Sequence, residues 1–124
     1  MRISQTISQV LIALFAVGCA TGPEAPKHVD RVEVLVYDTT QRSKSDHLDR
    51  YEESQTIERP FKEIALLTCE GACKEEVVMT EAIFYRAKNL GADAVVQLQS
   101  HSGMNREGSH RCVFRYKAIA YEAP

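Results

Sequence analysis

The segment between Cys73 and Gly91 constrains the fold most, because its apolar residues recur at the spacing of an α-helix. Acidic residues open the segment at Glu75 and Glu76, basic residues lie near its end, and Gly91 stands where helices commonly stop. The residues expected on the apolar face are Val77, Thr80, Ile83, Phe84, Ala87 and Leu90. The sequence therefore predicts an amphipathic helix whose apolar side must be covered by another layer.

Apolar and β-branched runs on both sides of this helix predict that the other layer is a β-sheet. We expect strands over residues 32–37, 61–69, 92–99 and 111–121. In the last run the side chains expected to face the core are Cys112, Phe114, Tyr116, Ala118 and Ala120, and the alternate ones should be wet. With 124 residues the chain has room for one domain. The predicted fold is α+β: a four-stranded mixed sheet, in the order β-β-α-β-β, with the helix packed on one face.

Two polar stretches are expected to be loops. Residues 38–59 are nearly all polar, with a short helical turn expected around residues 46–51, and residues 102–108 form a turn-rich loop before the last strand. Loops on a rigid scaffold are where binding surfaces concentrate. We therefore expect these two loops to meet a partner.

The N-terminal residues differ in composition from the rest of the chain. Arg2 is the only charged residue before Glu24, and residues 10–17 form a short apolar run. Such a run is shorter than a membrane-spanning helix requires and is typical of a secretory signal peptide. This segment could be a plain signal peptide, a short membrane anchor or the signal peptide of a lipoprotein.

The four residues AVGC, at positions 16–19, resemble the bacterial lipobox, in which the cysteine is lipidated after cleavage. The resemblance implies that Cys19 begins the mature chain and carries acyl chains such as palmitate, which hold it on a membrane. The residue after the cysteine is Ala20 rather than Asp, and by the same resemblance this implies sorting to the outer membrane of a Gram-negative cell. The predicted organisation is a signal peptide at 1–18, a lipidated tether at 19–29 and a small periplasm-facing α+β domain at 30–124.

Outside the cytoplasm thiols tend to be oxidised, so a disulfide is expected among Cys69, Cys73 and Cys112. A β-α-β crossover followed by a hairpin should bring these cysteines, His101 and His110 to one edge of the sheet. In the loop-entropy model a Cys69–Cys73 bridge contributes about 2 kcal/mol and a Cys69–Cys112 bridge about 4 kcal/mol. We predict the Cys69–Cys112 disulfide, with Cys69–Cys73 as the alternative pairing and Cys73 as the remaining thiol.

A metal site is the alternative use of the same residues. Three thiolates from Cys69, Cys73 and Cys112, with one imidazole from His101 or His110, would suit Zn²⁺ or Cu(I). Redox catalysis is not expected, because three residues separate Cys69 from Cys73 and thioredoxin-like motifs have two.

Other functions find no support in the composition or the motifs. The net charge is −2 and no basic stripe is visible, so nucleic acid is not an expected partner. The sequence has no G-x-S-x-G, no H-E-x-x-H and no glycine-rich phosphate loop, so we predict no catalytic residues, no cofactor and no enzymatic activity. The residues expected to form a solvated polar surface are His28, Asp46, His47, Asp49, Glu52 and Glu53.

Three pieces of the sequence together resemble a known family. They are RPFKEIALL at residues 59–67, AKNLGADAVVQL at 87–98 and FRYKAIAY at 114–121. They look like the β-α-β-β domains of YbjQ-type proteins and of the outer-membrane lipoprotein that senses envelope stress for the Rcs phosphorelay. The resemblance implies this fold for residues 59–121. It also implies a non-catalytic interaction or stress-sensor module of the cell envelope, with another envelope protein as partner.

Overall fold

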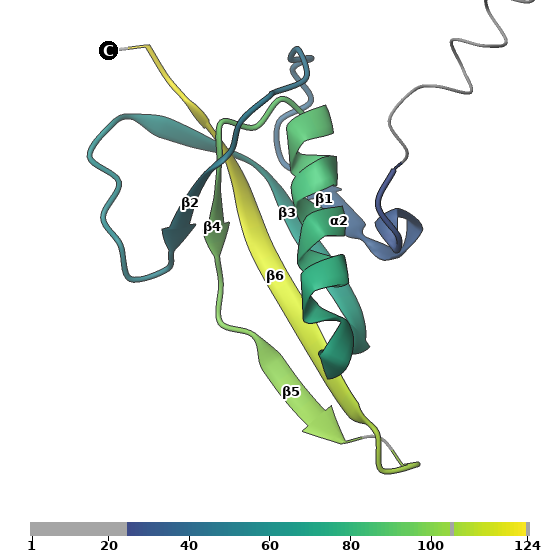
Figure 1. Ribbon diagram of the computed structural model, residues 1–124. Coiled ribbons are helices and arrows are strands. Elements are labelled where there is room, and N and C mark those ends of the chain that lie inside the picture. The colour runs from purple at the N-terminus through teal and green to yellow at the C-terminus, as the bar shows by residue number, and fades with distance from the viewer. Residues whose placement is uncertain (1–24, 105, 124) are drawn as a thin grey trace, which may run out of the picture.

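The computed structural model describes residues 25–104 and 106–123, which form one mixed sheet and one α-helix (Figure 1). The α+β class is therefore confirmed. The predicted signal peptide at 1–18 and the lipidation site Cys19 lie outside the described residues.

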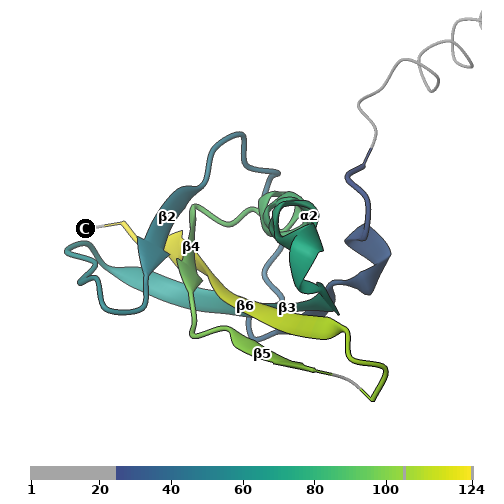
Figure 2. The same cartoon turned by 60° about the horizontal axis from the view of Figure 1, so that its bottom comes forward.

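The described strands make a six-stranded sheet in the order β1-β3-β6-β4-β2, with β5 paired to β6. The strands are β1 (Glu33–Val36), β2 (Asp49–Glu52), β3 (Phe61–Ala72), β4 (Ala94–Gln97), β5 (His101–Met104) and β6 (His110–Tyr121). The helices are α2 (Glu76–Asn89) and the 3₁₀ turns η1 (Val29–Arg31) and η2 (Cys73–Glu75). Both β3 and β4 run antiparallel to β6, so they are parallel to each other as the β-α-β pattern predicts, with β6 between them. Figure 2 shows α2 lying over one face of this sheet.

The predicted number of four strands is too low, because two short strands were expected to be other structures. Residues 46–51 were expected to contain a helical turn, but Asp49–Glu52 form β2, which pairs in parallel with β4. Residues 102–108 were expected to be a loop, but their first part belongs to β5, which pairs with the beginning of β6. Both strands are short and polar, so their extended conformation comes from tertiary pairing rather than from local propensity.

The core lies between α2 and the sheet. The strand side chains that face the helix include Ala65, Leu67, Cys69, Val95, Phe114, Tyr116 and Ala118, and all of them are buried. The buried residues of the helix are Met79, Ala82, Ile83 and Ala87. The prediction that Val77 belongs to the apolar face is wrong, since its side chain is 67% exposed. Val77 and Met79 are two positions apart, which is about 200° around a helix, so the two side chains lie on opposite sides and burying one exposes the other.

The opposite face of the sheet is partly covered by the loop after β2. Ile119 on this face is fully buried. A cavity of about 170 Å³ remains between the loop and the sheet, and its lining includes Ile57, Phe61, Val96 and Ile119. This face is therefore less exposed to solvent than strand alternation alone predicts.

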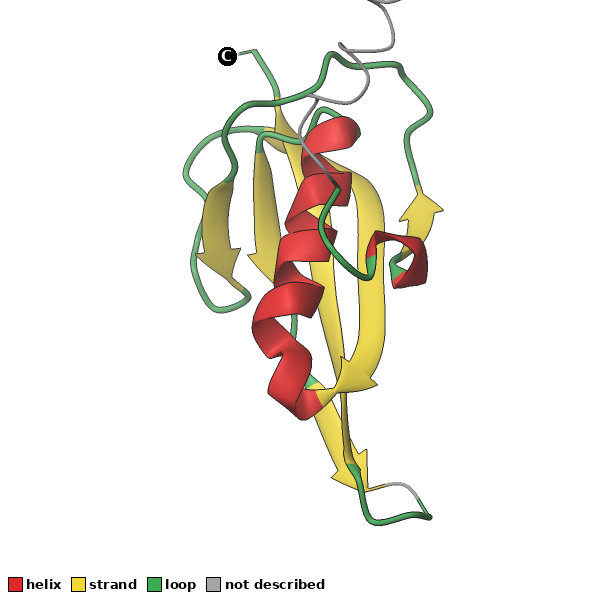
Figure 3. Cartoon of the chain, turned by 45° about the vertical axis from the view of Figure 1, so that its right-hand side comes forward, coloured by secondary structure: helices red, strands yellow, loops and turns green. Residues whose placement is uncertain are grey.

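The β5–β6 hairpin extends beyond the rest of the sheet (Figures 1 and 3). We call residues 101–104 and 110–113 the hairpin arm. All residues of β5 are exposed, and Met104 is 64% exposed. Because so little of the arm is buried, its position depends on attachments at its base.

Candidate functional site

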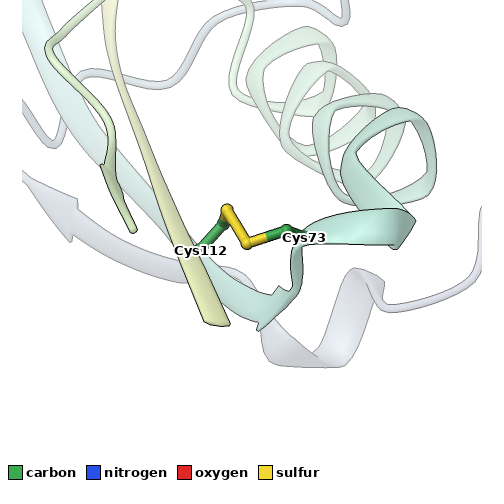
Figure 4. The surroundings of a disulfide bond; sticks show 2 residues. All are labelled: Cys73 and Cys112. Carbon is green, nitrogen blue, oxygen red and sulfur yellow. A yellow bond between two sulfur atoms is a disulfide. The ribbon is translucent and has the colours of Figure 1, made fainter. Parts of the chain in front are cut away.

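A disulfide joins Cys73 to Cys112, with 4.9 Å between their Cα atoms (Figure 4). Cys73 begins η2, directly before the helix, and Cys112 lies on β6 within the hairpin arm. The expectation of a disulfide that includes Cys112 is confirmed, and the predicted Cys69–Cys112 pairing is wrong. The bond fixes the base of the arm to the start of α2.

The sheet register explains why Cys73 is the partner. Cys69 lies opposite Phe114 on β6, and Gly71 lies opposite Cys112. Cys69 and Cys112 are therefore diagonal neighbours, about 7–8 Å apart between Cα atoms, which exceeds the usual span of a disulfide. The chain turns into η2 after Ala72, and this turn brings Cys73 back over Cys112.

Cys69 is the cysteine that remains as a thiol, where Cys73 was expected to remain. Cys69 is buried in the core beneath α2. Burial raises the pKa of its thiol, which disfavours the thiolate. A buried, protonated thiol is a poor nucleophile and a poor metal ligand, so Cys69 acts as a small core residue.

The two histidines of the metal hypothesis lie on different faces of the sheet. His110 shares the face of Cys112, two residues away, whereas His101 pairs with Val113 and lies on the opposite face. Two of the three cysteines are already joined. Among residues 25–104 and 106–123, no group of three or more His, Cys, Asp or Glu side chains could hold a metal ion.

A groove of about 630 Å³ lies beside the disulfide. Its lining is Ala72, Cys73, Lys74, Glu107, Ser109, His110 and Arg111. Two of these side chains, Lys74 and Arg111, are cationic, and the only sulfur is the oxidised one of Cys73. Glu107 adds a carboxylate to the same lining, so the groove can accept polar groups of either charge.

The N-terminal segment is attached at the same end of the domain. The His28 Nε2–H donates to the Glu75 carboxylate over 2.7 Å, and Glu75 ends η2. This hydrogen bond lowers the pKa of Glu75. The prediction that His28 is simply solvated is wrong, whereas His47 is exposed as expected. We call the Cys73–Cys112 bond, the His28–Glu75 pair and the groove the disulfide end of the domain.

A second cluster, which was not predicted, lies at the opposite end of β6. The Tyr121 hydroxyl donates to the Asp49 carboxylate over 2.6 Å, and the Tyr51 hydroxyl lies 2.8 Å from that of Tyr121. The Tyr121 backbone N–H donates to the Asp93 carboxylate over 2.8 Å, and the Arg59 guanidinium stacks 3.6 Å above the Tyr121 ring. We call these residues the tyrosine end.

The charges at the tyrosine end favour a hydrogen-bonded clamp over acid–base chemistry. Burial, together with the hydrogen bonds to Asp49 and Tyr51, raises the pKa of Tyr121. The hydrogen bonds from Tyr121 and then His47 lower the pKa of Asp49. The phenol therefore remains a donor and the carboxylate remains an acceptor near neutral pH. Asp49 was expected to be solvated surface, but it is the acceptor that joins β2 to β6.

None of the helices in residues 25–104 and 106–123 is both long and apolar enough to cross a membrane. Comparison with known proteins gave no match among family models, curated proteins or solved structures.

Proposed function

We propose that the chain is a non-catalytic lipoprotein of the bacterial cell envelope, anchored to the outer membrane through Cys19 and exposed to the periplasm. Its folded domain is an interaction or stress-sensor module, and its partner is another envelope protein. The YbjQ-type and Rcs-lipoprotein resemblance of residues 59–121 supports the same role. The Cys73–Cys112 disulfide is the observation that carries the proposal.

The disulfide favours an oxidising compartment. Structural disulfides persist in the periplasm and on cell surfaces and are rare in the cytosol. This bond closes a sequence separation of 39 residues, for which the loop-entropy model gives about 4 kcal/mol. A small domain that depends on such a bond gains from export, which agrees with the signal peptide expected at residues 1–18.

The hairpin arm is the surface that we assign to partner binding. Parts of the expected binding loop at residues 38–59 are engaged within the domain: Ser45 N–H donates to the Lys88 carbonyl, and Asp49–Glu52 form β2. The described residues from His101 to Arg111 are all exposed, and Met104 gives this surface an apolar side chain. An exposed hairpin held at its base by a covalent bond is a suitable element for contacting a second protein.

The alternative function, metal binding through thiols and histidines, has less support. The disulfide occupies Cys73 and Cys112, Cys69 is buried, and His101 lies across the sheet from the remaining candidates. Metal binding would require reduction of the disulfide and rearrangement of the arm.

Metabolic labelling with a fatty acid, followed by intact mass spectrometry of the membrane fraction, tests the lipoprotein assignment. We expect an acylated chain that begins at Cys19 and contains one disulfide. A Cys19→Ala variant should lose the label, and a Cys69→Ala variant, which keeps the lipobox, should retain it. A wild-type chain that begins at Met1, lies in the cytosol and carries no acyl group would contradict the proposal.

Site-specific photocrosslinking in intact cells tests the assignment of the arm. A photoreactive residue at Met104 should give a discrete adduct with one envelope protein. The same residue at Val77, which is equally exposed but lies on the helix, should not give that adduct. Equal yields of the adduct from both positions would contradict the assignment of the hairpin arm as the partner-binding surface.

A further inference from the structure

The strand β1 leaves an unusual set of apolar side chains in solvent. It is the last strand on its side of the sheet, at the margin seen in Figure 3. Three consecutive large apolar residues at its end are exposed: Leu35 by 57%, Val36 by 44% and Tyr37 by 52%. Edge strands of this kind pair readily with another chain unless charge, proline or a covering segment blocks them.

The other edge of the sheet shows such blocking. The edge strand β2 has the sequence Asp49-Arg50-Tyr51-Glu52, in which three of the four residues are charged. The sequence of β1 is Glu33-Val34-Leu35-Val36, with one charged residue at its start. β1 and β2 therefore differ in their capacity to accept a further strand, and β1 is the apolar one. The third edge, β5, pairs only with β6 and has one exposed large apolar side chain, Met104.

The backbone of β1 is oriented for such pairing. The Tyr37 N–H donates to the Ile64 carbonyl over 2.9 Å, so it points into the sheet towards β3. Backbone groups alternate in direction along a strand, so those of Leu35 also point towards β3, and those of Val34 and Val36 point outwards. The outward groups flank Leu35 symmetrically.

We propose that a second copy of this chain pairs with β1 in antiparallel register, with the two-fold axis at Leu35. In this register Val34 of each copy exchanges main-chain hydrogen bonds with Val36 of the other, and the two Leu35 residues form a non-hydrogen-bonded pair. The sheets of the two copies become continuous. The proposal does not depend on lipidation of Cys19 or on the sensor role.

The side chains of β1 are complementary to themselves in this register. Leu35 meets Leu35 on one face of the joined sheet, and Val34 meets Val36 on the other. Glu33 lies opposite Tyr37, whose hydroxyl can donate to the carboxylate. The pairing places no like charges opposite each other, which would destabilise a cross-strand pair. The segment that best fits the open edge is therefore the same edge of another copy.

Disulfide trapping tests the axis directly, because a residue on a two-fold axis faces itself. In a non-hydrogen-bonded pair the two Cα atoms are about 4.5 Å apart, within disulfide range. The full-length Leu35→Cys chain should form a crosslinked dimer under mild oxidation at least about tenfold faster than the Val77→Cys chain. Cys19 and Cys69 are common to both chains, so the difference in rate reports position 35 alone. Equal rates would overturn the proposal.

Sedimentation equilibrium of the full-length chain, in density-matched detergent, provides a second test without new cysteines. A short strand pairing buries little surface, so we expect a dissociation constant on the order of micromolar. Leu35→Lys places two ammonium groups opposite each other and should leave a monomer. Val77→Lys makes the same chemical change on the helix and should associate like the wild type. A wild type that stays monomeric, or equal association of both variants, would overturn the proposal.

Discussion

The two ends of β6 are held in place by different chemistry. Cys112 and Tyr121 lie nine residues apart on this strand, about 30 Å at the rise of a β-strand. At the disulfide end a covalent bond and the His28–Glu75 pair fix the base of the hairpin arm. At the tyrosine end a carboxylate, two phenols and a guanidinium join β2, β6 and the loop after β2.

The difference follows from how much apolar surface each end buries. At the tyrosine end, Ala94 and Ile119 are fully buried, so packing already stabilises the strands there. At the disulfide end β5 is entirely exposed and contributes no core residue. A hairpin that buries little apolar surface is marginally stable in water. Here the disulfide provides the stabilisation that burial does not. The two ends should therefore respond differently when their attachments are removed.

Removal of the disulfide should have the largest effect. The Cys73→Ala/Cys112→Ala double variant leaves no unpaired thiol from the bond and should lose about 4 kcal/mol of unfolding free energy. Urea denaturation followed by circular dichroism measures this loss. Hydrogen exchange should show the fastest change in the amides of the hairpin arm and in η2, while the tyrosine end keeps its protection.

The Cys69→Ala variant is the matched control for this prediction. It removes a buried sulfur but leaves the Cys73–Cys112 bond, so its loss of stability should be clearly smaller. Non-reducing peptide mapping of this variant should still recover the Cys73–Cys112 crosslink. Failure to recover it, together with unchanged stability of the double variant, would contradict the assigned pairing.

The sequence predicted the elements that carry their own pattern. The helix, the strands near residues 61–69 and 111–121, and the parallel direction of β3 and β4 follow from apolar periodicity and from the β-α-β connection. The strand β2 carries no such pattern, because Asp49-Arg50-Tyr51-Glu52 has no apolar alternation and becomes a strand only beside β4. Its misassignment as a helical turn follows from that missing signal.

The candidate site was predicted only to the level of one edge of the sheet. The choice between Cys69 and Cys73 depends on register, since Cys112 lies opposite Gly71 rather than opposite Cys69. A single sequence does not contain that register. The tyrosine end was missed for the same reason: Asp49 and Tyr121 are 72 residues apart and meet only through the order of the strands. Tyr121 at the end of the alternating last strand was the one available signal.

In the turn between α2 and Asp93, which leads into the tyrosine end, Gly91→Ala should cause the next largest effect. Gly91 has a φ of +79°, and an added Cβ would lie 2.4 Å from Arg42 Cβ and 2.7 Å from the Ser43 carbonyl oxygen. We expect a loss of about 3 kcal/mol from backbone strain and displacement of the residue 42–43 segment. Thermal denaturation measures the change.

Gly108→Ala separates the two causes of this loss. Gly108 has a similar φ of +81°, but no atom lies within 4 Å of an added Cβ. Its variant should therefore lose only about 1 kcal/mol, from the left-handed conformation alone. Equal losses at both glycines would show that packing of residues 42–43 against Gly91 contributes nothing to this end.

Tyr121→Phe should have a smaller effect than either change. It removes the hydroxyl that donates to Asp49 and accepts from Tyr51, and it keeps the ring beneath Arg59. We expect a loss of about 1 kcal/mol, measured by urea denaturation, with increased hydrogen exchange in β2. Tyr85→Phe keeps the ring beneath Lys44, lies outside both the tyrosine end and β1, and should leave stability unchanged. If both variants behave alike, the hydrogen-bonded clamp does not stabilise the tyrosine end.

Acid should weaken both ends, and this is the smallest of the predicted effects. The pKa of Asp49 is lowered below its ordinary value of 3.8 by the hydrogen bonds from Tyr121 and His47, and that of Glu75 is lowered below 4.5 by the hydrogen bond from His28. A carboxyl with a lowered pKa in the folded state contributes stability at neutral pH. That contribution is lost as the pH falls through the folded pKa. The melting temperature should therefore decrease below about pH 4.

Asparagine at position 49 isolates the contribution of the tyrosine end to this acid response. Asp49→Asn keeps an oxygen that can accept from Tyr121 but does not titrate, so its melting temperature should fall less steeply below about pH 4 than that of the wild type. Asp46→Asn changes an exposed carboxylate nearby and should retain the wild-type slope. Because Glu75 remains in both variants, the slope that persists in Asp49→Asn includes the contribution of the disulfide end. Identical slopes for all three proteins would mean that folding does not stabilise the ionised form of Asp49. The tyrosine end would then be held by packing alone.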